Sequence, residues 1–153
     1  MASRTGVYVC HCGSNIAGVI DCPALAERAR SLPGVAVARD CDYMCSDAGQ
    51  ALIRSDIETL GLDRVVVAAC SPRMHEHTFR AALEEAGLNP YLLEMANIRE
   101  QCSWVHDEGD AATRKAASLV AGAVARVALH RELERREFPV TGAVLVLGAG
   151  IAG

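Results

Sequence analysis

Short apolar runs recur four times along this chain, and each of them leads into a cysteine. The runs are Val7–Cys10, Val35–Cys41, Val65–Cys70 and Tyr91–Asn97, the last of which is followed by Cys102. Valine-rich runs of this length, bounded by turn and helix-start signals, are typical of buried parallel strands. We therefore predict strands over residues 6–10, 35–40, 64–69 and 91–95.

Helical patterns separate these runs. Apolar residues three and four positions apart predict helices over 22–32, 47–60 and 75–86. Asp21 and Ser46 are suited to cap the first two helices, and Gly87 follows the third. This alternation predicts an α/β fold, a Rossmann- or flavodoxin-like parallel sheet of about four strands with helices on both faces and right-handed crossovers.

The pattern changes after the fourth run. Apolar residues recur at helical spacing from Ala112 to Leu133, while the end of this stretch is highly charged. We predict one long C-terminal helix over Asp110–Glu137 that packs at its start and becomes solvated towards its end.

The final residues carry a glycine motif. A predicted strand, Ala143–Leu147, leads into Gly148, Gly150 and Gly153, which have the spacing G-x-G-x-x-G. A strand followed by this motif opens a dinucleotide-binding unit, in which the glycines let the backbone approach a pyrophosphate. The printed chain stops at the third glycine, so we expect residues 1–138 to form one domain and 139–153 to begin a flavin or nicotinamide domain.

Composition narrows the classes of function. The chain has 153 residues with 51% apolar residues and a net charge of −4, which is enough for one soluble domain with its own core. There is no basic stripe to suggest a nucleic-acid partner, and no apolar stretch approaches the roughly 20 residues of a membrane span. The N-terminus has no signal-peptide pattern, so we predict a cytoplasmic protein.

The seven cysteines are the candidate chemistry. Because the carboxyl ends of parallel strands lie at one edge of a sheet, thiols that follow different strands should meet there. Five cysteines qualify, namely Cys10, Cys12, Cys45, Cys70 and Cys102. Several precede predicted helix starts, where the backbone N–H groups are expected to lower the pKa of a thiol. Cys22 is expected to be a packed thiol, and Cys41 is either a core residue at a strand end or a sixth thiol near the site.

Thiolates from separate loops favour an iron–sulfur cluster over a single ion, since structural zinc usually uses closely paired C-x2-4-C ligands. Five candidates for four positions leave one thiol over. Two alternatives stay open: a thiol–disulfide redox domain that uses a pair such as Cys10 and Cys12, and a zinc-stabilised interaction module.

Longer motifs resemble a known family. VYVCHCGSNIAGVID, YMCSDAGQ, VVVAACSPRMHEHTF, GLNPYLLEMANIREQCSWVH and PVTGAVLVLGAGIAG occur in this order. Together they resemble the N-terminal region of the heterodisulfide reductase A-subunit (HdrA) family, over nearly all of residues 6–153. The resemblance implies a [4Fe–4S] cluster held by the candidate cysteines, upstream of an FAD domain at whose start this chain is cut off.

The resemblance also implies a role for the domain. It would relay electrons between the flavin and a partner in a flavin-based electron-bifurcating oxidoreductase, without being catalytic on its own. The implied partners are the other heterodisulfide reductase subunits and a hydrogenase, formate dehydrogenase or ferredoxin-type electron donor; a homodimer is also open. Gly148, Gly150 and Gly153 would contact FAD in the longer protein.

Overall fold

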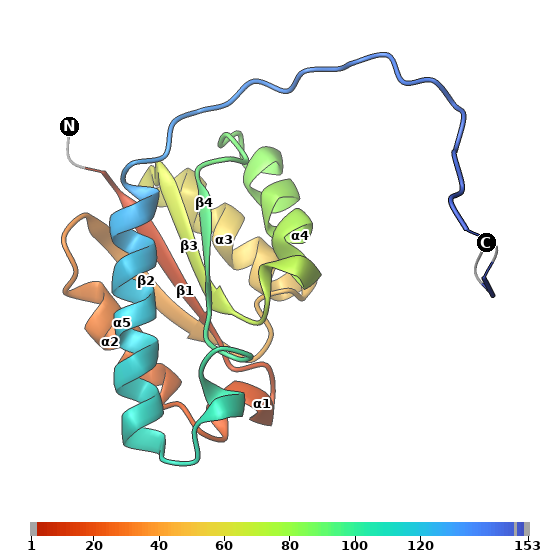
Figure 1. Ribbon diagram of the computed structural model, residues 1–153. Coiled ribbons are helices and arrows are strands. Elements are labelled where there is room, and N and C mark those ends of the chain that lie inside the picture. The colour runs from red at the N-terminus through yellow and green to blue at the C-terminus, as the bar shows by residue number, and fades with distance from the viewer. Residues whose placement is uncertain (1–2, 149, 152–153) are drawn as a thin grey trace.

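A computed structural model describes residues 3–148 and 150–151. Four parallel strands form one sheet in the order β2-β1-β3-β4 (Figure 1). The strands are β1 (Thr5–Cys10), β2 (Val35–Cys41), β3 (Arg64–Ala69) and β4 (Leu93–Asn97). The predicted α/β class and the four-stranded parallel sheet are therefore confirmed.

Helices cover both faces of the sheet (Figure 1). The helices α2 (Cys22–Arg30) and α5 (Gly109–Val127) share one core with the Val7 and Val9 side of β1. The helices α3 (Asp47–Leu60) and α4 (Pro72–Glu85) share the other core with Tyr8. The alternation along β1 reflects the two-residue period of a strand. The sequence patterns did not predict two short helices, α1 (Ser14–Ala17) and η1 (Ser103–Val105).

Side-chain caps explain where the helices begin. The Asp21 carboxylate accepts a hydrogen bond of 2.9 Å from the backbone N–H of Ala24, and Ser46 accepts one of 3.3 Å from Gly49. Ser71 caps α4 in the same way, so this helix begins at Pro72, one turn before the predicted start at His75.

The C-terminal helix is shorter than predicted. It ends at Val127, whereas the pattern predicted a helix to Glu137. Arg64 donates hydrogen bonds of 3.0 Å to the Val127 carbonyl and 3.4 Å to the His130 carbonyl, which satisfies the end of the helix. Leu133 is exposed, so the residues beyond Val127 lack a buried apolar stripe that would keep them helical.

The last described segment has no regular secondary structure from residue 130 to 148. The predicted strand Ala143–Leu147 does not form there, because a strand needs a hydrogen-bonded neighbour and its side chains stay exposed. Gly148 and Gly150 belong to the described residues, and Gly153 lies outside them. Within the described residues, no helix combines the length and apolar character needed to cross a bilayer.

Candidate functional site

Four of the five candidate cysteines follow neighbouring strands at the carboxyl edge of the sheet, which is the lower end of the molecule in Figure 1. Cys10 ends β1 and Cys12 lies in the turn after it. Cys45 precedes Ser46, the cap of α3, and Cys70 precedes Ser71, the cap of α4. We call Cys10, Cys12, Cys45 and Cys70 the four-thiol site.

The position of these thiols at the ends of neighbouring strands is reflected in their pKa shifts. Burial raises the pKa of Cys10 to about 11; a 3.4 Å hydrogen bond from the Met44 N–H opposes this, and the charges of Cys12 and Cys45 add to it. Burial also raises the pKa of Cys70, where the charge of Arg99 opposes the shift and those of Cys12 and Cys45 reinforce it. Cys10 and Cys70 therefore both interact with the same two thiols.

The expectation that a helix N-terminus lowers the pKa of the thiol before it is wrong for Cys70. Cys10 and Cys70 are both buried, with exposed fractions of 4% and 6%, and desolvation raises the pKa of each thiol. This outweighs the backbone N–H groups at Cys10 and the charge of Arg99 at Cys70, which both act to lower it. Metal binding at this site must therefore release protons, because only the thiolate is a ligand.

The turn after β1 has an unusual backbone. Cys12 has a φ of 51° and Gly13 a φ of 57°, so two successive residues are left-handed. A Cβ atom at position 13 would lie 2.9 Å from the hydroxyl of Tyr43, so the Tyr43 side chain would have to shift, and the positive φ itself favours glycine. A non-glycine residue in this region costs of the order of 1 kcal/mol, and such residues are concentrated at functional sites.

The structure does not bring Cys102 to the other four thiols. Its Sγ donates a 3.2 Å hydrogen bond to the carbonyl of Ala112 in α5, within the core between the sheet, α2 and α5. Burial raises the pKa of Cys102 and the charge of Lys115 opposes this, while none of the thiols contributes. Cys22 is fully buried in the same core, as expected, and half-buried Cys41 lies opposite Cys10 in the β1–β2 pair.

Arg99 is a residue of this site that the sequence patterns did not indicate. Its Nη1 donates a 3.1 Å hydrogen bond to Cys12 Sγ, and its Nη2 contacts Met74 Sδ at 3.1 Å and Glu100 Oε1 at 2.7 Å. The guanidinium also lies over the ring of Trp104, 4.6 Å from the centroid. The only signal in the sequence was the Arg99-Glu100 pair itself, which comes two residues after the end of β4, at the edge of the sheet where the cysteines lie.

The arrangement leaves polar atoms unpaired. Arg99 Nε and Glu100 Oε2 are both buried and have no hydrogen-bond partner among the described residues. Buried polar groups without partners are rare and require an explanation. An unpaired N–H beside a thiol is a donor that the sulfur atoms of a larger anionic group could satisfy.

The side chains at the four-thiol site do not form a ready-made metal site. Among the described residues, no three His, Cys, Asp or Glu side chains are arranged to hold one metal ion. His11 is turned to carboxylates instead, with its Nε2 2.9 Å from Asp40 and its Nδ1 3.1 Å from Asp42. The four-thiol site nevertheless offers four thiols from three separate turns, with a cationic hydrogen-bond donor beside Cys12, and thiolates are the donors that both iron–sulfur clusters and structural zinc use.

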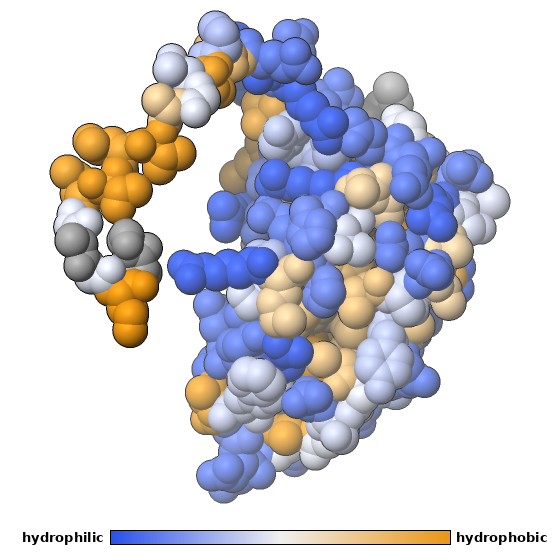
Figure 2. Space-filling view, turned by 90° about the vertical axis from the view of Figure 1, so that its right-hand side faces the viewer, coloured by the Kyte–Doolittle hydropathy of each residue, from blue (hydrophilic) through white to orange (hydrophobic). Residues whose placement is uncertain are grey.

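Apolar side chains are exposed around the four-thiol site. Trp104 and Tyr43 are 56% and 53% exposed, and Met74 and Val105 are similarly open. Tyr43 lies against the turn at Gly13, and Met74 and Trp104 both contact Arg99. Figure 2 shows pale and orange side chains gathered in the lower part of one face, below a mostly blue upper part.

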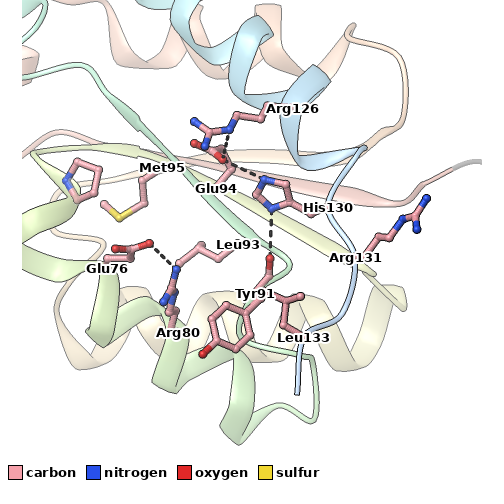
Figure 3. Close-up of a pocket in the computed structure, with 11 residues that line it drawn as sticks. Glu76, Arg80, Tyr91, Leu93, Glu94, Met95, Arg126, His130, Arg131 and Leu133 are labelled. Atoms are coloured by element: carbon pink, nitrogen blue, oxygen red, sulfur yellow. Dashed lines mark hydrogen bonds and ion pairs between the residues drawn. The ribbon is translucent and has the colours of Figure 1, made fainter. Parts of the chain in front are cut away.

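A cavity of about 460 Å³ lies elsewhere, between β4, α4 and the residues after α5 (Figure 3). Apart from Arg131, its charged residues are paired with one another: Arg80 with Glu76 at 2.7 Å, and both Arg126 and His130 with Glu94 at 3.3 Å. None of the described residues that line it is a cysteine. We therefore place the candidate chemistry at the four-thiol site rather than in this cavity.

Comparison with known proteins gives close relatives. No family model matches the chain. It is 60% identical over 151 residues to the iron–sulfur A-subunit 2 of the CoB–CoM heterodisulfide reductase of Methanopyrus kandleri. It is 56% identical over 151 residues to the A-subunit of the H2:CoB–CoM heterodisulfide, ferredoxin reductase of Methanothermobacter thermautotrophicus. It is 51% identical over 154 residues to the iron–sulfur A-subunit of the CoB–CoM heterodisulfide reductase of Methanocaldococcus jannaschii.

These alignments cover 98%, 98% and 100% of the chain, but only 23% of each relative. The chain thus spans about a quarter of the length of the relatives that it matches. Along the part that it spans, the chain belongs to the heterodisulfide reductase A-subunit family.

Proposed function

We propose that this domain holds one [4Fe–4S] cluster at the four-thiol site and relays electrons in a heterodisulfide reductase complex. The proposal is supported by four thiols that follow three neighbouring strands at one edge of the sheet, beside an arginine that donates to Cys12 and whose buried Nε–H has no partner among the described residues. The term "iron–sulfur" in the names of two relatives supports it.

When bound, such a cluster supplies one-electron transfer, in which no atom or proton has to move. The ligands that we propose are Cys10, Cys12, Cys45 and Cys70. Cys102 is then the spare thiol of the five candidates, because it would have to leave a buried core and its hydrogen bond to Ala112 to reach them. The exposed apolar rim around the site offers a surface on which a redox partner could dock.

The wider context is part of the same proposal. Residues 139–153 would begin an FAD domain in which Gly148, Gly150 and Gly153 contact the cofactor, and the flavin would exchange electrons with this domain. The names of relatives mention H2, ferredoxin and F420H2, which supports a hydrogenase or a ferredoxin-type donor as partner. A formate dehydrogenase, bifurcation at the flavin, a homodimer and a cytoplasmic location remain predictions from the sequence.

Anaerobic reconstitution with iron and sulfide tests the cluster. We expect about four irons and four sulfides per chain, broad visible absorbance and an EPR signal after reduction. C12S and C70S should lose most of the iron, whereas the matched variants C102S and C22S should keep it.

Three results would contradict the proposal. Folded protein that stays colourless and binds no iron would exclude the cluster. One zinc per chain with no sulfide would support the zinc module instead. A single defined disulfide after mild oxidation, with no metal bound, would support the thiol–disulfide domain.

A further inference from the structure

We propose that the Arg99–Glu100 pair sets the reduction potential of the four-thiol site, with Arg99 raising it and Glu100 lowering it. This inference rests on the proposed function, since it concerns the cluster held by Cys10, Cys12, Cys45 and Cys70. It assigns positioning and electrostatic roles to two residues that are not ligands themselves.

Contacts from several elements fix the guanidinium of Arg99 beside the sulfur of Cys12. Cys12 accepts from Nη1 at 3.1 Å, Met74 of α4 lies 3.1 Å from Nη2, and Trp104 of η1 lies under the planar group. The backbone is held as well, since Asn97 Oδ1 accepts a 3.2 Å hydrogen bond from the Arg99 N–H. The side chain is only 11% exposed, so this is not a mobile surface arginine.

Electrostatics gives the direction of the effect. Reduction adds one negative charge to a cluster, so a nearby cation stabilises the reduced form more than the oxidised form and raises the potential. Hydrogen bonds to the sulfur atoms act in the same direction, and Arg99 has one to Cys12 and an unpaired Nε–H to spare. Low exposure reduces the screening by water and salt.

Glu100 supplies the opposite charge. Its carboxylate is 2.7 Å from Arg99 Nη2, and its side chain is 28% exposed. Burial acts to raise the pKa of Glu100, but the hydrogen bond and charge of Arg99 act to lower it, and its pKa is lowered overall. The ionised carboxylate of Glu100 therefore offsets part of the positive charge that Arg99 places beside the four-thiol site.

Variants with opposite expected signs test the proposal. R99M removes the charge and the hydrogen bond while keeping an unbranched side chain, and should shift the midpoint potential to a lower value. E100Q removes only the negative charge and should shift it to a higher value. R99K keeps a charge without the planar fork and should lie between wild type and R99M. R73M alters the exposed arginine of the same rim and should leave the potential unchanged.

The potentials are measured by EPR-monitored redox titration on reconstituted protein, with iron and sulfide counts and circular dichroism for each variant. If wild-type protein binds no iron, the proposed function fails. If the variants bind iron normally and R99M and E100Q titrate like wild type, this inference fails while the proposed function stands. If R99M loses the cluster, the test rests on E100Q. A midpoint potential of E100Q that is equal to or below that of wild type overturns the inference.

Discussion

Two arginine-centred clusters are built against strand β1, and they differ in how completely their polar atoms are paired. Arg39 binds Asp56 through two hydrogen bonds, of 2.6 Å to Oδ2 and 2.9 Å to Oδ1, and the Tyr8 hydroxyl donates a third of 3.1 Å to Oδ2. Arg99, which follows β4 and reaches Cys12 after the end of β1, instead contacts sulfur atoms. Its Nε and the Oε2 of Glu100 have no hydrogen-bond partner within the described part of the chain.

The difference separates a structural network from a site. The Asp56 cluster connects β1, β2 and α3 through Tyr8, Arg39 and Asp56, so it stabilises the packing of this face of the sheet. A buried network with unpaired atoms costs free energy in the absence of a further group. We therefore expect substitutions in the first cluster to change stability and those in the second to change the properties of a bound group.

The largest effect is expected from D56A. Removing this carboxylate leaves the fully buried Tyr8 hydroxyl without its acceptor and Arg39 without its partner. Because the Arg39 side chain is 43% exposed, water can solvate it again, and we expect the free energy of unfolding to fall by about 3 kcal/mol. Urea denaturation of the metal-free protein measures this.

The matched control is E27A, which breaks the exposed ion pair of Arg30 and Glu27 on α2. Exposed pairs contribute little, so we expect a change of less than about 0.5 kcal/mol. Equal losses in D56A and E27A would contradict the structural role of the Asp56 cluster.

A somewhat smaller effect is expected from alkaline pH. Burial raises the pKa of Cys10 from the ordinary 9.0 to about 11. Burial raises the pKa of Cys22 further, to about 12, and the charges of Asp40, Cys10 and Asp21 add to this shift. The folded state therefore holds these protons more tightly, so this stability is fully present below about pH 9 and is lost as the pH rises through 11 to 12.

We expect the metal-free protein to lose about 2 kcal/mol by pH 10, as measured by urea denaturation at a series of pH values. C22A should make the dependence shallower, because one of the thiols with a raised pKa is then absent. A free energy of unfolding that stays level or rises from pH 8 to 10 would show that these thiols are not buried in this way.

A smaller loss in the free energy of unfolding is expected from Y8F. It removes the hydroxyl that donates to Asp56 and keeps the buried ring, so only one hydrogen bond is lost. We expect a loss of about 1 kcal/mol in the free energy of unfolding. A loss as large as that of D56A would mean that Tyr8, rather than Arg39, provides most of the stabilisation of Asp56.

The smallest effect on stability is expected from R99M in metal-free protein. The substitution removes hydrogen bonds to sulfur and the contact with Trp104, but it also removes a buried N–H that has no partner among the described residues. We expect a change within about 1 kcal/mol in either direction. A loss of the size seen in D56A would show that Arg99 is structural and would weaken the contrast between the two clusters.

Local patterns predicted most of the elements of this fold. The bounds of α3 and β3 are those predicted, because periodicity and a capping serine act over a few neighbouring residues. The length of the C-terminal helix was overestimated. Apolar residues continue at helical spacing past Val127, but there they have no surface to pack against and stay exposed. The strand at Ala143–Leu147 was predicted from the apolar run that leads into the glycine motif, yet a strand depends on a hydrogen-bonded neighbour that local sequence cannot supply.

The chain's own sequence determined that several thiols would gather at one edge of a parallel sheet, since strand direction and right-handed crossovers follow from the alternation of elements. Only the tertiary structure decided which thiols those are. Cys102 follows β4 but turns into the core under α5, while Arg99 from the same loop reaches Cys12. Side-chain direction after a strand depends on packing between segments distant in sequence, and a linear pattern does not contain that information.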